Sequence, residues 1–385
     1  MLDLLMTIVT YIVPFILVLS VIVFVHEFGH FIVGRWCGVQ VDAFSIGFGP
    51  ELLSRVDRYG TRWRLAAIPL GGYVKFHGDA NAASGPALEV VDAMPAAERA
   101  VTFAAQTIWK RSAIVAAGPM ANFLLAIALF FTMNVYYGRT TLAARVSEVV
   151  AGGAGEQAGF LPRDLVLRID GETIDAFSRM QEIVSVSADK KLLFTVRRGD
   201  HEVSFEATPA WREVVTPMGK QRIGVLGLKA STDEADMNDV RYGVAQSMTR
   251  AVAETWDVTY QTGAYIGRLV TGNETTEQLS GPIGIARISG EVAQVAVKVG
   301  LKPVLHLIAL LSISVGLLNL MPVPLLDGGH LLFFGIEAAR GGRALNEKAQ
   351  EFAFRVGLAM VGVLMIFSTY NDISRLIQRF TGGAS

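Results

Sequence analysis

Cysteine is nearly absent from this chain, because Cys37 is the only one in 385 residues. A single thiol can form no intrachain disulfide, and it excludes a metal site built from four thiolates. Charge is also scarce: charged residues make up 18% of the chain and hydrophobic residues 51%, a balance typical of membrane proteins. The formal net charge of -1 gives no support for nucleic-acid binding.

Long apolar runs predict four transmembrane helices. Residues 4–25 carry no charged side chain, and this run of about 22 residues is long enough to cross the roughly 30 Å hydrocarbon core of a bilayer. It lacks the basic n-region and the cleavage site of a signal peptide, so we expect a retained helix. The four predicted spans are residues 4–33, 113–135, 304–320 and 356–370.

Lys and Arg residues predict the orientation of these spans. They are concentrated between the first and second spans and again between the third and fourth, so both connections are expected to be cytoplasmic. Within the first connection, residues 64–76 are apolar and β-prone with Gly71 and Gly72 at their middle. This pattern predicts a membrane-associated β-hairpin or re-entrant loop.

A compact β-rich unit is predicted between the second and third spans. Alternating residues predict strands at 144–150, 165–170, 192–197 and 203–207 and a helix at 176–186. Residues 158–164, followed by Ile169-Asp170-Gly171, resemble the signature of PDZ domains, in which a peptide adds as a strand beside the domain's own edge. Arg163 stands where a glycine is common in that signature, and from residue 229 on the pattern turns helical.

The chain is therefore expected to be a polytopic α-helical membrane protein with about four transmembrane helices, a membrane-associated β-hairpin loop and one inserted β-rich PDZ domain. The predicted parts are an N-terminal membrane domain at 1–135, a PDZ domain at 136–213, an amphipathic helical connector at 214–303 and a C-terminal membrane domain at 304–385.

The first span carries the most informative motif, His26-Glu27-Phe28-Gly29-His30. Two imidazoles four residues apart lie on one face of a helix, where both can bind one Zn²⁺, and the adjacent Glu27 can activate water on the metal. A chain of this composition would contain the pattern by chance only about 0.01 times. The alternative, two packing histidines, is disfavoured because polar groups inside a membrane are costly.

A catalytic zinc needs a third protein ligand, and two residues compete for this role. Asp327 follows the third span beside two glycines, and His330 lies three residues further on. Their spacing does not separate them, and Asp-Gly is also a common turn pair.

These motifs together resemble the site-2 protease family of intramembrane zinc metalloproteases, in particular its bacterial members. The resemblance rests on residues 26–30, on Asn-x-x-Pro-x-Pro-x-Leu-Asp-Gly at 319–328, and on the PDZ-like insert between the second and third spans. It implies one Zn²⁺ per chain, bound by His26, His30 and Asp327, with Glu27 as general base. It also implies substrate-binding residues, namely Asn319 and the edge strand formed by Gly71, Gly72, Tyr73, Val74, Lys75 and Phe76.

The resemblance further implies cleavage of transmembrane segments of single-span membrane proteins, either anti-sigma-factor-like substrates or signal-peptide remnants. The setting would be the lipid bilayer of the bacterial inner membrane, with the PDZ domain periplasmic and the active site near the cytoplasmic side. Two other classes remain open: a metal transporter, which needs no base at Glu27, and a non-catalytic PDZ scaffold, which needs neither zinc nor Glu27.

Overall fold

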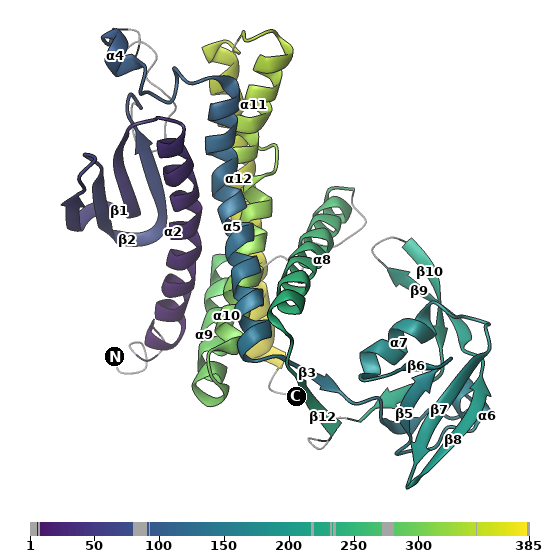
Figure 1. Cartoon of the computed structure of the whole chain (residues 1–385). Coiled ribbons are helices and arrows are strands. Elements are labelled where there is room, and N and C mark those ends of the chain that lie inside the picture. The colour runs from purple at the N-terminus through teal and green to yellow at the C-terminus, as the bar shows by residue number, and fades with distance from the viewer. Residues whose placement is uncertain are drawn as a thin grey trace. The chain divides into compact units, whose positions relative to one another are not determined.

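The computed structural model describes residues 6, 8–79, 91, 93–216, 219–231, 233, 236–271, 281–343 and 345–382. The chain divides into two compact units (Figure 1). Residues 1–131 and 248–385 form the first, which we call the helical unit, and residues 132–247 form the second, which we call the strand-rich unit.

Four long apolar helices dominate the helical unit. They are α2 (Val13–Trp36), which continues the π-helical turn η1 (Ile8–Ile12), α5 (Ile108–Tyr136), α10 (Lys302–Asn319) and α12 (Glu347–Gly382). Each is long and apolar enough to cross a membrane, which confirms the four predicted spans. Helix α12 is much longer than the predicted span, because polar residues at both ends continue the helix beyond the apolar stretch that hydropathy detects.

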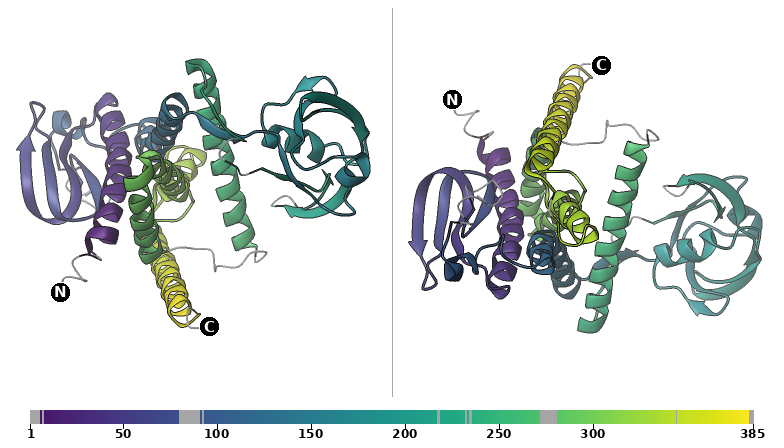
Figure 2. Two further views of the ribbon diagram at one scale, coloured as in Figure 1. Left: turned by 90° about the horizontal axis from the view of Figure 1, so that it is seen from below. Right: turned by 90° about the horizontal axis from the view of Figure 1, so that it is seen from above.

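The long helices pack through aliphatic side chains. Val18 and Ile22 of α2 and Leu307 and Ile308 of α10 form one buried cluster. Helix α9 (Pro282–Val299) lies beside both α2 and α10 (Figures 1 and 2). A further short helix, α11 (Asp327–Ala339), precedes α12 in the chain.

Strands β1 (Val41–Val56) and β2 (Arg62–Phe76) form a bent sheet in the helical unit. Residues 43–46 pair with residues 72–75 along one side and with residues 62–65 along the other, and residues 51–56 pair with residues 62–66. The sequence predicted a hairpin within 64–76. The structure corrects this: the stretch is one strand that bends at Gly71 (φ 125°), and its partner precedes it in the chain. A local pattern of apolar residues does not determine which strand pairs with it.

Aromatic side chains attach this sheet to α2. The ring of Phe31 lies 5.5 Å from that of Phe44 and 5.1 Å from that of Trp63, both in edge-to-face geometry. Phe31 and Phe44 are buried, so the sheet packs firmly along the same helix that carries the two histidines.

The strand-rich unit begins with β3 (Arg139–Leu142), β4 (Val146–Val149) and the short helix α6 (Ala154–Ala158). Its largest sheet has the strand order β6-β5-β7-β8. Strands β5 (Leu165–Ile169), β7 (Leu192–Arg198) and β8 (His201–Ala207) and the helix α7 (Phe177–Ser185) match predicted elements. The short strand β6 (Glu172–Thr173) was not predicted. Arg163 adopts φ 74°, a left-handed conformation that glycine adopts more easily.

Strands continue further along the chain than the sequence indicated. They are β9 (Ala210–Thr216), β10 (Gly219–Val225), β11 (Leu228–Ala230) and β12 (Met237–Val240), and the long helix α8 (Val244–Val270) starts only afterwards. Strand β11 pairs with β4 and β12 with β3. Because these partners lie more than 75 residues earlier in the chain, their pairing leaves no local signal in the sequence.

Candidate metal centre

His26, His30 and Asp327 bring three ligand atoms to one point. The Nε2 atoms of the two histidines lie 3.2 Å apart. The Oδ2 atom of Asp327 lies 3.1 Å from His26 Nε2 and 3.5 Å from His30 Nε2. The helical period places the two rings on one face of α2, whereas Asp327 reaches them from the first residue of α11, about 300 residues later in the chain.

The surroundings of His30 determine how its ring is protonated. Its Nδ1 atom lies 2.8 Å from the carbonyl oxygen of Ile114 in α5. A carbonyl oxygen can only accept, so Nδ1 carries the proton, and in the neutral ring Nε2 presents a lone pair to the cluster. This is the arrangement in which a histidine binds a metal through one nitrogen and is oriented through the other.

Asn122 of α5 stands in the same relation to His26. Its side-chain amide lies 3.3 Å from His26 Nδ1 and is fully buried. With the amide nitrogen toward the His26 ring, the amide oxygen has no hydrogen-bond partner among the described residues. With the amide turned by 180°, the oxygen accepts a hydrogen bond from His26 Nδ1–H. The Ser312 hydroxyl donates to the Asn122 backbone oxygen at 2.9 Å and so holds α10 against this point of α5.

Glycines allow α2 and α5 to approach each other closely. A Cβ atom on Gly118 would lie 2.5 Å from His30 Cε1 and 2.9 Å from His26 Cε1. A Cβ atom on Gly29 would lie 2.8 Å from the Cβ atom of Ala121. Side chains do not pack this closely, so a larger residue at either position would have to push the two helices or the rings apart.

Two features of α11 position Asp327, the tight turn before the helix and an ion pair near its end. Gly328 and Gly329 follow it, and a Cβ atom on either would collide with the backbone of the turn that precedes α11. Further along α11, Glu337 accepts a 2.6 Å hydrogen bond from the Arg111 guanidinium of α5, and both side chains are largely buried. This buried ion pair holds α11, which carries Asp327, against α5, which contacts both histidines.

Glu27 faces the β1–β2 sheet. The backbone N–H of Val74 donates a hydrogen bond to its carboxylate. A Cβ atom on Gly72 would lie 3.1 Å from Glu27 Cγ. Among the described residues, 72–76 pair with β1 along one side only, so Glu27 lies beside an edge of the sheet and next to the cluster of His26, His30 and Asp327.

The cluster fits a zinc ion. Ligand atoms that each lie about 2.0–2.1 Å from one tetrahedral Zn²⁺ are roughly 3.3 Å from one another, close to the three separations measured here. Asp327 Oδ2 is buried and has no hydrogen-bond partner of good geometry among the described residues. This carboxylate oxygen faces two ring nitrogens, at least one with its lone pair inward, so the three groups offer a cation one oxygen and two nitrogen ligands.

Comparison with known proteins agrees with this geometry. The profile of peptidase family M50 matches residues 14–364. The chain belongs to peptidase family M50. It is 46% identical over 368 residues to a protein of Agrobacterium fabrum named "Putative zinc metalloprotease", covering 95% of this chain and 96% of the relative. It is 39% identical over 393 residues to Metalloprotease MmpA of Caulobacter vibrioides, covering 96% of this chain and 97% of the relative.

Membership in family M50, the site-2 protease family, makes this chain a multi-pass membrane zinc metalloprotease. Of the two residues that competed as third ligand, Asp327 joins the histidines, whereas His330 turns its ring toward Phe354 of α12, with ring centroids 5.6 Å apart. Asn319 is the last residue of α10, and the predicted edge strand is residues 71–76 of β2.

The sequence reasoning missed three groups of this M50 site. The Ile114 carbonyl, Gly118 and Asn122 were not predicted to belong to the site. A signal was present, because Gly118 and Asn122 begin and end the run Gly118-Pro119-Met120-Ala121-Asn122. A separation of four positions places both on the face of α5 that meets α2.

Proposed function

We propose that this M50 protease cleaves transmembrane segments of single-span membrane proteins in regulated intramembrane proteolysis. Anti-sigma-factor-like proteins and signal-peptide remnants are the proposed substrates. The observation that carries the proposal is the position of Glu27, which lies between the cluster of His26, His30 and Asp327 and the edge of β2.

The three clustered residues are proposed as the zinc ligands. When bound, zinc polarises the carbonyl of the scissile peptide and makes a nearby water more acidic. Glu27 takes a proton from that water and returns it to the leaving amine, the usual role of a carboxylate beside such a cluster. The backbone N–H of Val74 holds the Glu27 carboxylate in place for both proton transfers.

Residues 71–76 are proposed to bind the substrate backbone. A peptide bond inside a helix has its carbonyl hydrogen-bonded and shielded, so cleavage within a bilayer requires local unwinding. An unwound segment leaves polar backbone groups unsatisfied, and pairing with an open strand edge satisfies them. Asn319 is proposed to hold the same segment extended, and helix-breaking residues in the substrate should favour cleavage.

Residues 136–213, within the strand-rich unit, are proposed to form a single PDZ domain on the periplasmic side of a bacterial inner membrane, with the active site near the cytoplasmic side. Some family members carry two such domains, and here we propose one. Its role would be to exclude proteins whose bulky outer portions have not been trimmed. The PDZ-like signature at 158–164 and 169–171 and the match of strands β5, β7 and β8 support this assignment.

The test compares wild type with Glu27→Gln and His26→Ala in proteoliposomes that contain a single-span test substrate. Glu27→Gln should keep about one zinc per chain and lose cleavage by roughly 10²–10⁴-fold, because only the proton transfer is removed. His26→Ala should lose zinc and cleavage together. Full activity of both variants would refute the proposal, and zinc flux across the membrane without cleavage would indicate a transporter.

A further inference from the structure

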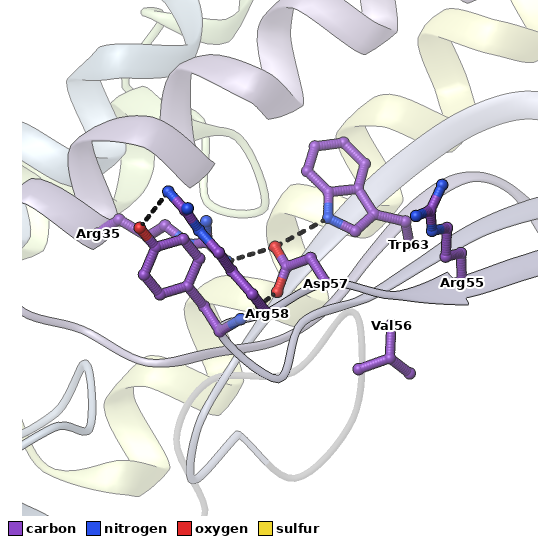
Figure 3. Close-up of a pocket in the computed structure, with 7 residues that line it drawn as sticks. Arg35, Arg55, Val56, Asp57, Arg58 and Trp63 are labelled. Carbon is purple, nitrogen blue, oxygen red and sulfur yellow. Dashed lines mark hydrogen bonds and ion pairs between the residues drawn. The ribbon is translucent and has the colours of Figure 1, made fainter.

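A pocket lies at the end of α2, away from His26, His30 and Asp327 (Figure 3). Its volume is about 500 Å³. It forms because the turn between β1 and β2 folds back onto the last turn of the helix, where the Arg35 guanidinium lies 4.7 Å from the centre of the Tyr59 ring. The residues that line it are Arg35, Arg55, Val56, Asp57, Arg58, Tyr59 and Trp63.

The single acidic group of this pocket is already neutralised. Asp57 accepts hydrogen bonds from the Arg35 guanidinium at 2.7 Å and from the Trp63 indole at 3.2 Å, as Figure 3 shows. The backbone N–H groups of Tyr59 and Thr61 donate to its other oxygen. Burial alone would raise the pKa of this carboxyl, but these donors hold its pKa at about 2. The Asp57 carboxylate therefore stabilises the turn, and its negative charge is already paired with Arg35.

The Glu51 carboxylate of β1 is also paired. Glu51 forms ion pairs with both Arg62 and Arg64, each at 2.6 Å. Arg55 and Arg58, in contrast, have no carboxylate partner among the described residues, and both are exposed. The sheet therefore carries two guanidinium groups whose charge no residue of its own balances.

One of these guanidiniums is held in place rather than free. Arg58 lies 4.7 Å from the centre of the Tyr59 ring, and its Nη2 donates to the Tyr59 hydroxyl at 2.8 Å. Arg55 lies beside Trp63 in Figure 3, its cross-strand neighbour in the sheet. A guanidinium has five N–H donors, and one at most is used in Arg58, so both groups present free donors suited to a phosphate.

The surroundings are apolar and lie where a membrane-spanning helix ends. Helix α2 ends at Trp36, whose exposed fraction is 76%. Val56 and Tyr59 in the pocket are 60% and 62% exposed, and the neighbouring residues of β1 are exposed as well, Leu52 to 63% and Leu53 to 69%. Exposed tryptophan, tyrosine and aliphatic side chains at the end of a span are typical of the level of lipid headgroups.

We propose that Arg55 and Arg58 bind the phosphoryl group of an anionic phospholipid, with the exposed apolar residues of β1 against its acyl chains. The balanced pair of Arg35 and Asp57 shapes the site without adding charge to it. Docking at a headgroup would hold the β1–β2 sheet at one depth in the membrane. This inference concerns lipid binding and does not depend on the proposed cleavage reaction.

The test measures phospholipid retention by native mass spectrometry on the purified full chain in mixed micelles of phosphatidylglycerol and phosphatidylcholine. Wild type should retain phosphatidylglycerol preferentially. Arg55→Gln and Arg58→Gln should each reduce that retention about 5-fold and the double variant about 25-fold, since one arginine near an anionic surface contributes about 1 kcal/mol. Replacing both by lysine should preserve most of the retention, which separates charge loss from misfolding.

Arg62→Gln is the matched control, because it removes the same charge from the same sheet but from a residue paired with Glu51. It should leave retention within about 2-fold of wild type. Equal retention by the double variant, an equal loss in Arg62→Gln, or no preference for phosphatidylglycerol in wild type would each overturn the inference. Displacement of the lipid by millimolar inorganic phosphate would also overturn it, because the site would then be one for soluble anions.

Discussion

Gly118→Ala should abolish zinc binding while leaving the protein folded. The added Cβ atom would lie 2.5 Å from His30 Cε1 and 2.9 Å from His26 Cε1, where ordinary carbon contacts measure about 3.4–4 Å. The overlap with the His30 ring is therefore on the order of 1 Å. The rings have little room to move away, because Ile114 and Asn122 hold their outer nitrogens.

The expected loss of zinc affinity follows from how little a metal site tolerates changes in its ligand distances. Ligand distances are kept within about 0.2 Å, so a shift of about 1 Å removes a histidine from the coordination sphere. We expect zinc affinity to fall by more than the 10–100-fold that the loss of an orienting group costs. The free energy of unfolding of the zinc-free protein should fall by only about 1–3 kcal/mol, the usual cost of one extra methyl group in a packed interior.

The assay is a competitive zinc titration on the purified protein together with thermal unfolding. Gly335→Ala is the matched control, because it makes the same change in α11 at a position where nothing lies within 4 Å of the added Cβ. The control should bind zinc like wild type. Normal zinc affinity in Gly118→Ala would show that the rings adapt to the methyl group and that the close approach of the two helices is not needed.

Two further predictions concern Asn122 and Asp79. Asn122→Leu should weaken zinc binding about 10–100-fold. Asn122→Asp keeps an oxygen that can accept from His26 Nδ1–H and should retain zinc binding. Equal affinity of the two variants in the zinc titration would argue against an orienting role for Asn122. Burial raises the pKa of Asp79 to about 7, so the stability it contributes is complete below pH 4 and is lost as the pH rises through 7. The melting temperature of Asp79→Asn relative to wild type should therefore increase between pH 5 and pH 8, and a constant difference would contradict the burial of this carboxyl.

Local periodicity was sufficient for much of the architecture. The spacing of His26 and His30 places both rings on one side of any helix, whatever surrounds it. The uncharged runs predicted four spans, because only a helix satisfies its own backbone inside a bilayer. Alternation predicted strands β5, β7 and β8, since one face of each is buried.

Everything that depends on pairing between distant segments was decided by the tertiary structure. Asp327 and His330 are three residues apart, and it is the tight turn before α11 and the ion pair of Arg111 with Glu337 that place Asp327 beside the histidines. Residues 64–76 look the same in sequence whether they fold on themselves or pair with β1. Gly118 carries no ionisable group, and its importance lies in the helix across from it. A chemical motif is encoded by neighbours in the chain, but a third ligand, an open strand edge and the space for two imidazoles arise only when remote segments pack together.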